Sequence, residues 1–442
     1  MKSQRHEVTA SELDEAGLGV GLSAGTRVHV ADLLPGERAE VAVDHASPHK
    51  PEAWARIVRR IGKPSPERVE PRCPGFGRCG GCVWQHLSYP AQLAAKKARV
   101  EAALGRPVTD VRPSPQLFGY RNKGKYVAGQ AGAHVILGAY APRTHHVVDT
   151  LGCRVVAPII DEVASWVRGA AEAAQLVPYD EPKRTGELRY VVIREAAGDV
   201  MISLVVASGT PRSKLEQVGS AMSKHPAVRG LVAITNDRRD GAIVPSGSSA
   251  QVLLGHGHIV EELAGVAIAV GTGEFLQVNR AQAAAMYARV AELAMEPGGK
   301  TAVDLFAGLG GIGLHLARAG AEVTAVEIDR DAVAQLRRAA ERASLPLRAV
   351  GGDAGTLPRE ELPEAPDIVV VNPPRKGLSD GAHRLLVELA APTVIYVSCG
   401  PESLGRDLAA LAQHGYTPDV IEPFDLMPGT AQVEAVVRLR RA

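Results

Sequence analysis

The sequence has few aromatic residues and no long apolar run. Phe, Trp and Tyr make up 4% of the 442 residues, and no apolar stretch approaches the ~18 residues of a membrane helix. The first residues, MKSQRHEVTASELDEAG, carry both charge signs and no apolar core of the signal-peptide kind. We therefore expect a cytoplasmic protein without a membrane segment, whose abundant Ala, Gly, Val and Leu build α/β layers.

Net charge is also nearly absent, at +1, but its distribution is uneven. Residues 1–130 hold 20 Lys/Arg and 13 Asp/Glu, whereas residues 131–442 hold 30 and 36. A basic N-terminal part suggests a module that faces nucleic acid, and a solvated basic surface is the alternative. Hydrophobic residues at 45% and charged residues at 22% exclude a disordered or fibrous protein.

Cysteine is scarce, with five residues in the chain. An odd number in a cytoplasmic protein does not indicate a disulfide framework. Cys73, Cys79 and Cys82 nevertheless fall within ten residues, in the run CPGFGRCGGC. Such clustering predicts metal ligation.

The chain length suggests two to four domains at ~100–200 residues each. Short alternating segments broken by Gly and Pro predict a small β-barrel or sandwich over residues 1–64. The Pro-rich stretch 63–75 is typical of a linker, and residues 89–104 predict an amphipathic helix. We expect a central α/β domain over 65–265, with this helix packed on a C-terminal domain over 266–442.

Regular alternation of strands and helices from residue 266 onward predicts a doubly wound parallel sheet. The closing segment 419–441 predicts two strands joined by a turn, at an antiparallel edge. The expected fold class is thus α/β, with a Rossmann-like C-terminal domain.

A glycine-rich turn follows the first strand of this domain, in the run DLFAGLGGIG. Gly308 and Gly310 allow a tight turn and close approach of a ligand. Glu327 comes nineteen residues after Gly308 and can accept hydrogen bonds from a ribose. The pattern fits NAD, FAD or S-adenosylmethionine, and a turn without any ligand is the alternative.

Further polar residues follow the other predicted strands. Asp304, Asp353, Asn372 and Cys399 all fall at carboxyl ends of parallel strands, which form one ligand-binding rim. An opening Asp combined with Asn-Pro-Pro suits a methyltransferase better than a dehydrogenase, because S-adenosylmethionine has no pyrophosphate.

Cys399 precedes a predicted helix, whose N-terminus should lower the thiol pKa. A thiolate that attacks C6 of a pyrimidine makes C5 nucleophilic enough to take a methyl group. A carboxylate must then remove the C5 proton, and Glu434 is the best candidate. The alternatives are a buried, inert Cys399 and a solvated Glu434 on the strand surface.

Several motifs together resemble the RNA 5-methyluridine (uracil-C5) methyltransferases that carry an N-terminal TRAM domain of the OB type. They are CPGFGRCGGCVWQH, FGYRNKGKY, GEFLQVN, DLFAGLGGIGL, NPPRKGL, YVSCGP and QVEAVV, in the family's order. The resemblance covers nearly the whole chain. It implies a class I methyltransferase that modifies C5 of a uridine in structured RNA.

The resemblance also implies roles for individual residues. Cys399 matches the family nucleophile and Glu434 its base. The expected contacts to S-adenosylmethionine are Gln277, Phe306, Gly308, Gly310, Glu327, Asp353 and Asn372. The chain departs from the family at Gly311, where Asn is usual, and at Asn372, where Asp is usual.

Four cysteines match the family's [4Fe–4S] ligands: Cys73, Cys79, Cys82 and Cys153. From the residues alone, four cysteines fit either an all-cysteine zinc site or an iron–sulfur cluster. A structural cluster is the simpler expectation, since no step of the chemistry needs electrons.

RNA contacts are expected from the barrel and from a basic loop. The barrel candidates are Trp54, Arg56, Arg59, Arg60 and Lys63, and the others are Arg121, Asn122, Lys123, Lys125 and Arg375. We expect 23S ribosomal RNA as substrate, with transfer RNA as the alternative, and a monomer without an obligate protein partner. Amino-group methylation and a non-catalytic iron–sulfur RNA-binding protein are the rival functions.

Overall fold

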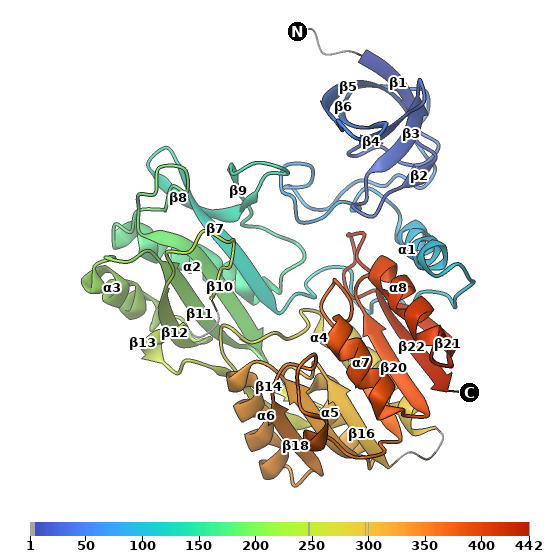
Figure 1. Cartoon of the computed structure of the whole chain (residues 1–442). Helices are drawn as coiled ribbons and strands as arrows, with labels where there is room; N and C mark the ends of the chain where they lie inside the picture. The colour runs from blue at the N-terminus through green and yellow to red at the C-terminus, as the bar shows by residue number, and fades with distance from the viewer. Residues whose placement is uncertain (1–4, 246–247, 297, 299, 442) are drawn as a thin grey trace.

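The computed structural model describes residues 5–245, 248–296, 298 and 300–441. Three sheets dominate it, each in its own part of the chain (Figure 1). No helix in these described ranges is both long and apolar enough to cross a membrane.

The N-terminal unit is all-β, as the alternation predicts. Its six strands form one sheet in the order β1-β5-β6-β4-β3-β2, around a small apolar core that includes Val28 and Val41. The strands are β1 (Arg5–Thr9), β2 (Glu12–Leu13), β3 (Gly19–Ser23), β4 (Thr26–Val30), β5 (Arg38–Ala46) and β6 (Glu52–Ile61).

Helix α1 spans Tyr89–Leu104, the range that the sequence predicts. Ser88 caps its first turn by accepting a hydrogen bond from the amide of Ala91 at 3.3 Å, and Gly105 ends it with a φ of 63°. The helix lies against α8 (Pro401–Ala412) of the C-terminal domain (Figure 1). The chain therefore contacts the C-terminal domain before it forms the strands of the central domain.

The central domain is a seven-stranded sheet in the order β13-β12-β11-β10-β7-β8-β9. Helices α2 (Pro158–Ala173) and α3 (Arg212–Met222) bury their apolar faces in its core. The strands are β7 (Lys123–Ala131), β8 (His134–Tyr140), β9 (Val147–Asp149), β10 (Leu188–Ala196), β11 (Asp199–Val206), β12 (Val228–Thr235) and β13 (Ala250–Gly255).

A short hairpin separates the central and C-terminal domains. Its strands, β14 (Ile259–Leu263) and β15 (Val266–Val270), form a separate two-stranded sheet. The side chains of Leu263, Val266 and Ile268 belong to the apolar core of the C-terminal domain. Leu263 thus contributes to this core although it precedes the expected boundary at 266.

The C-terminal domain confirms the predicted doubly wound sheet, in the order β18-β17-β16-β19-β20-β22-β21. The first five of these strands are parallel, and β22 and β21 form the antiparallel edge. The strands are β16 (Thr301–Leu305), β17 (Glu322–Glu327), β18 (Leu347–Gly351), β19 (Ile368–Val371), β20 (Thr393–Ser398), β21 (Tyr416–Phe424) and β22 (Glu434–Arg441), and the other helices are α4 (Arg280–Met295), α5 (Gly311–Arg318), α6 (Arg330–Arg342) and α7 (Asp380–Leu389).

Candidate active site and cysteine cavity

The carboxyl ends of the parallel strands carry the predicted polar residues. Glu327 is the last residue of β17, Asp353 lies two residues beyond β18, and Asn372 directly follows β19. Cys399 directly follows β20. Because all of these strands are parallel, their ends form a single rim at the topological switch point.

The glycine-rich turn between β16 and α5 holds Glu327 in place. The Gly308 amide donates to one carboxylate oxygen of Glu327 at 2.8 Å, and the Asp329 amide donates to the other at 2.8 Å. Phe306 adopts a φ of 64°, a left-handed conformation that non-glycine residues reach mainly at functional loops. Gly310 has a φ of 82°, and a Cβ there would lie 2.3 Å from Leu336.

Asp304 is 1% exposed, and neither carboxylate oxygen has a hydrogen-bond partner in the described residues. Burial raises its pKa to about 7. A buried carboxylate without partners is costly, and a cationic ligand group can offset that cost.

The ring of Tyr287, on α4, packs against Gly311 at the start of α5. A Cβ at position 311 would lie 2.6 Å from a carbon of this ring. The phenol is 6% exposed, and burial followed by the charges of Glu434 and Asp304 raises its pKa. The Gly311 departure from the family thus has a steric reason, since Tyr287 fills the space of a side chain.

One predicted RNA contact, Asn122, lies deeper than its expected role requires. Asn122 is 2% exposed, and its amide donates to the backbone carbonyl of Gln277 at 3.4 Å. Gln277 is itself 7% exposed. Asn122 thus joins the central domain to the Gln277 segment, and its side chain is not on the surface as the predicted RNA contact requires.

Asp353, by contrast, is exposed, and its carboxylate accepts a hydrogen bond from the Gly355 amide at 2.7 Å.

Cys399 and Glu434 come together through strand register. β20 and β22 pair antiparallel up to Ser398 and Ala435, so the next residues on each strand stand opposite one another. Arg375, in the loop after β19, affects the titration of both groups. Residues 35 positions apart in sequence thereby share one end of the sheet.

Burial and the charge of Glu434 raise the pKa of the Cys399 thiol, while Arg375 opposes this shift. The pKa of this thiol is therefore raised, with burial as the largest cause, whereas the sequence predicts a lowered one. Burial also raises the pKa of Glu434 to about 7, again opposed by Arg375. One carboxylate oxygen of Glu434 has no partner in the described residues.

The four cysteines Cys73, Cys79, Cys82 and Cys153 line one cavity of about 370 Å³. Burial raises the pKa of the Cys82 thiol to about 11 and the pKa of the Cys79 thiol above its ordinary value. No three Cys, His, Asp or Glu side chains in the described ranges lie as closely as a single bound ion requires.

Cationic side chains line the same cavity. Arg121, Lys123 and Lys125 contribute to its wall beside the cysteines. Burial, followed by neighbouring Arg194 and Lys125, lowers the pKa of Lys123 to about 7. Four thiolates around one group concentrate negative charge, which these side chains complement. The cavity thus combines four cysteines with a cationic wall.

The barrel cations are largely matched by acidic neighbours. Arg60 pairs with Asp32 at 2.7 Å and with Glu37 at 2.9 Å. Arg56 pairs with Asp44. Much of the predicted basic surface of the N-terminal unit is thus neutralised within the unit itself.

The comparisons with known proteins identify the family. Residues 285–393 match the family model "Methyltransferase small domain". An uncharacterised RNA methyltransferase of Halalkalibacterium halodurans is 32% identical over 98% of this chain and 96% of its own length. One of Thermosynechococcus vestitus is 32% identical over 98% and 97%. The chain belongs to the RNA methyltransferase family.

One solved structure resembles nearly the whole of this methyltransferase. It is the Pyrococcus abyssi tRNA (uracil-54, C5)-methyltransferase in complex with S-adenosyl-L-homocysteine, with a TM-score of 0.79 and 25% identity. The match covers 98% of this chain and 99% of that one. The Rossmann-like class I methyltransferase fold is thereby confirmed.

Sequence reasoning missed several residues of the site. Tyr287 carries no motif, and only its place on a helix beside the glycine-rich turn reveals it. The role of Arg375 beside the thiol was also missed, although its place after Asn-Pro-Pro on the ligand rim could have indicated it.

Proposed function

We propose that this RNA methyltransferase transfers a methyl group to C5 of a uridine, with Cys399 as nucleophile and Glu434 as base. The observation that carries the proposal is the register that sets Cys399 opposite Glu434 at the ligand rim. Amino-group methylation needs neither a thiol nor a base so placed.

The chemistry follows from these two groups. The Cys399 thiolate forms a bond to C6 of the uracil, and C5 then takes the methyl group from S-adenosylmethionine, which leaves as S-adenosylhomocysteine. The Glu434 carboxylate removes the C5 proton, the S–C6 bond breaks, and the ring and the thiolate are restored. Arg375 favours the thiolate over the thiol. The target base must leave its stack to reach Cys399.

For the methyl donor, we propose contacts from the glycine-rich turn and the strand ends. Asp304 and Glu327 supply two carboxylates. Backbone amides hold the Glu327 carboxylate, whereas the Asp304 carboxylate has no hydrogen-bond partner in the described residues. The remaining proposed contacts are Gln277, Phe306, Gly308, Gly310, Asp353 and Asn372.

We also propose a [4Fe–4S] cluster in the cysteine cavity and a TRAM role for the N-terminal unit. The shared cavity of the four cysteines and its cationic wall support the cluster. In the cavity wall, Arg121 and Lys125 are the proposed RNA contacts, together with Arg375 near the thiol. A monomeric state and a cytoplasmic location stay predictions.

The proposed substrate is structured RNA, with 23S ribosomal RNA first. The TRAM-like unit combined with the cysteine run supports it. Transfer RNA is the second candidate, and the printed activity of the Pyrococcus abyssi neighbour favours it.

The test uses anaerobically purified protein and methyl-labelled S-adenosylmethionine. Unmodified 23S rRNA and tRNA transcripts are offered separately and then digested to nucleosides. Label in 5-methyluridine from one RNA supports the reaction and identifies the substrate class. Equal label with Cys399→Ala excludes the covalent route. Label in another nucleoside overturns the proposed chemistry.

A further inference from the structure

The loop from Asp425 to Val433 joins β21 to β22 and leads directly into Glu434. The Glu434 backbone forms the last ladder pair with Phe424, and pairing with β20 begins only at Ala435. The sheet thus holds Glu434 from one side alone. The conformation of the loop decides how the carboxylate is presented on the other side.

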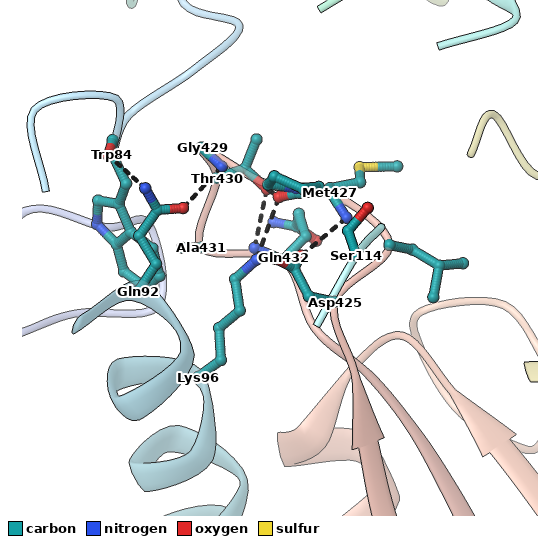
Figure 2. A network of polar contacts seen from close by, with 12 residues as sticks. Trp84, Gln92, Lys96, Ser114, Asp425, Met427, Gly429, Thr430, Ala431 and Gln432 are labelled. Atoms are coloured by element: carbon teal, nitrogen blue, oxygen red, sulfur yellow. Dashed lines mark hydrogen bonds and ion pairs between the residues drawn. The ribbon is translucent and has the colours of Figure 1, made fainter. Parts of the chain in front are cut away.

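Helix α1 holds this loop with one polar face. Gln92, Lys96 and Arg99 are spaced by four and three residues, so they lie on the same side of the helix. The Gln92 side-chain oxygen accepts from the Gly429 amide at 2.8 Å, and Arg99 donates to the Ala431 carbonyl at 3.0 Å. A helix from the N-terminal part of the chain therefore lies along the loop (Figure 2).

Lys96 makes the central contact of this face. Its ammonium donates to the Asp425 carboxylate at 2.5 Å and to the Met427 carbonyl at 3.1 Å. The same Asp425 oxygen accepts from the Met427 amide at 3.0 Å. Lys96 and Asp425 thus close a turn at the start of the loop, as Figure 2 shows.

Both side chains of this ion pair have no exposed surface. A buried ion pair often adds little net stability compared with apolar residues, because both charges lose their water. Its best-attested use is to fix one arrangement of the chain. Here the arrangement that it fixes is the loop that ends at Glu434.

The segment that carries the cysteines holds the loop at a second point. The amides of Val83 and Trp84 both donate to the Gly429 carbonyl, at 3.0 and 2.9 Å. Gln92 donates to the Trp84 carbonyl at 3.0 Å while it accepts from Gly429. Gly429 is therefore held through both its amide and its carbonyl.

We propose that Lys96 is a positioning residue for proton removal, acting through Asp425 and the loop that presents Glu434. The inference rests on the proposed function for its chemical meaning. Loss of Lys96 releases the turn at Met427 and displaces Glu434, while Cys399, which directly follows β20, keeps its place. Adduct formation then continues, whereas proton removal slows by about 10²-fold, the loss typical of a ~1 Å misplacement.

The test compares three variants with the wild type. Lys96→Met removes the ammonium, and Lys96→Met combined with Asp425→Asn also removes the unpaired buried charge, so that the protein folds. Lys97→Met is the matched control. It removes the ammonium of the residue next to Lys96, which forms an exposed ion pair with Asp110. Single-turnover assays measure the SDS-resistant RNA adduct and released 5-methyluridine separately, and hydrogen exchange follows the amides of 425–433.

We expect both Lys96 variants to accumulate adduct, release product about 10²-fold more slowly and exchange faster in the loop. Lys97→Met should match the wild type in all three respects. The inference is overturned if the double variant releases 5-methyluridine and exchanges its loop amides at wild-type rates. It is also overturned if the Lys96 variants lose adduct formation and product release equally. If the wild type makes no 5-methyluridine, the proposed function fails, and unchanged exchange in the Lys96 variants then overturns the inference separately.

Discussion

The ring of Tyr287 occupies the space into which a side chain at Gly311 would project, with 2.6 Å between the ring and the position of a Cβ. The same phenol lies near enough to Glu434 and Asp304 for their charges to raise its pKa. One aromatic residue thus packs on the glycine-rich turn and lies within electrostatic reach of the proposed base and of Asp304.

Gly311→Ala is expected to destabilise the protein by about 1–3 kcal/mol, the cost of overpacking a filled site, and to weaken binding of S-adenosylhomocysteine. Urea unfolding and calorimetric titration measure the two effects. Combining it with Tyr287→Leu should recover most of the lost stability, whereas Tyr287→Phe should not, because the ring remains. A neutral Gly311→Ala contradicts the steric account.

Asp304→Asn is expected to change how stability depends on pH. Burial raises the folded-state pKa of Asp304 to about 7, so the wild type is most stable below the unfolded-state pKa and loses stability as pH rises through 7. The variant lacks this pH-dependent loss. Its free energy of unfolding should therefore rise by up to about 3 kcal/mol relative to that of the wild type between pH 5 and pH 8. Urea unfolding at both pH values checks this, and weaker binding of S-adenosylmethionine should accompany it.

Glu434→Gln is expected to trap the RNA–protein adduct, because methyl transfer precedes proton removal. In the wild type the base acts as a carboxylate, so product release should rise with pH and level off above about 7, the pKa of Glu434. Denaturing gels and a pH series under single-turnover conditions measure both. Glu388→Gln, an exposed substitution on α7, serves as the control. Free product without adduct would assign proton removal to another group.

Removal of the proposed cluster is expected to speed hydrogen exchange in the cysteine segment and also in the loop that leads to Glu434. Cys82→Ser or chelation should remove iron and speed hydrogen exchange at Val83 and Trp84. Because both amides bond to the Gly429 carbonyl, exchange should also rise at 427–431. Iron and sulfide analysis with exchange mass spectrometry checks this. Purified protein that holds zinc in place of iron contradicts the cluster assignment.

Local signals were sufficient for much of the fold. Ser88, Pro90 and Gly105 mark both ends of α1, and the predicted and observed bounds agree. The polar residues that follow each strand identified the rim, because parallel strands leave only one place for their ends to meet.

Contacts between distant segments had no such signal. Nothing near Lys96 indicates that it pairs with Asp425, and an amphipathic helix ordinarily leaves its lysines in water. Asn122 belongs to a basic run that suggests a surface, yet it is buried against the Gln277 segment. Burial of a polar residue depends on partners that the chain brings from elsewhere.

The distance along the chain between Lys96 and Asp425 has a consequence for synthesis. The two residues are 329 positions apart, so at ~5–20 residues per second a ribosome needs roughly 20–60 s to make the second after the first. Throughout this interval Lys96 lacks the carboxylate that it contacts in the folded structure. A product truncated before residue 425 therefore contains α1 without the ionic partner of Lys96.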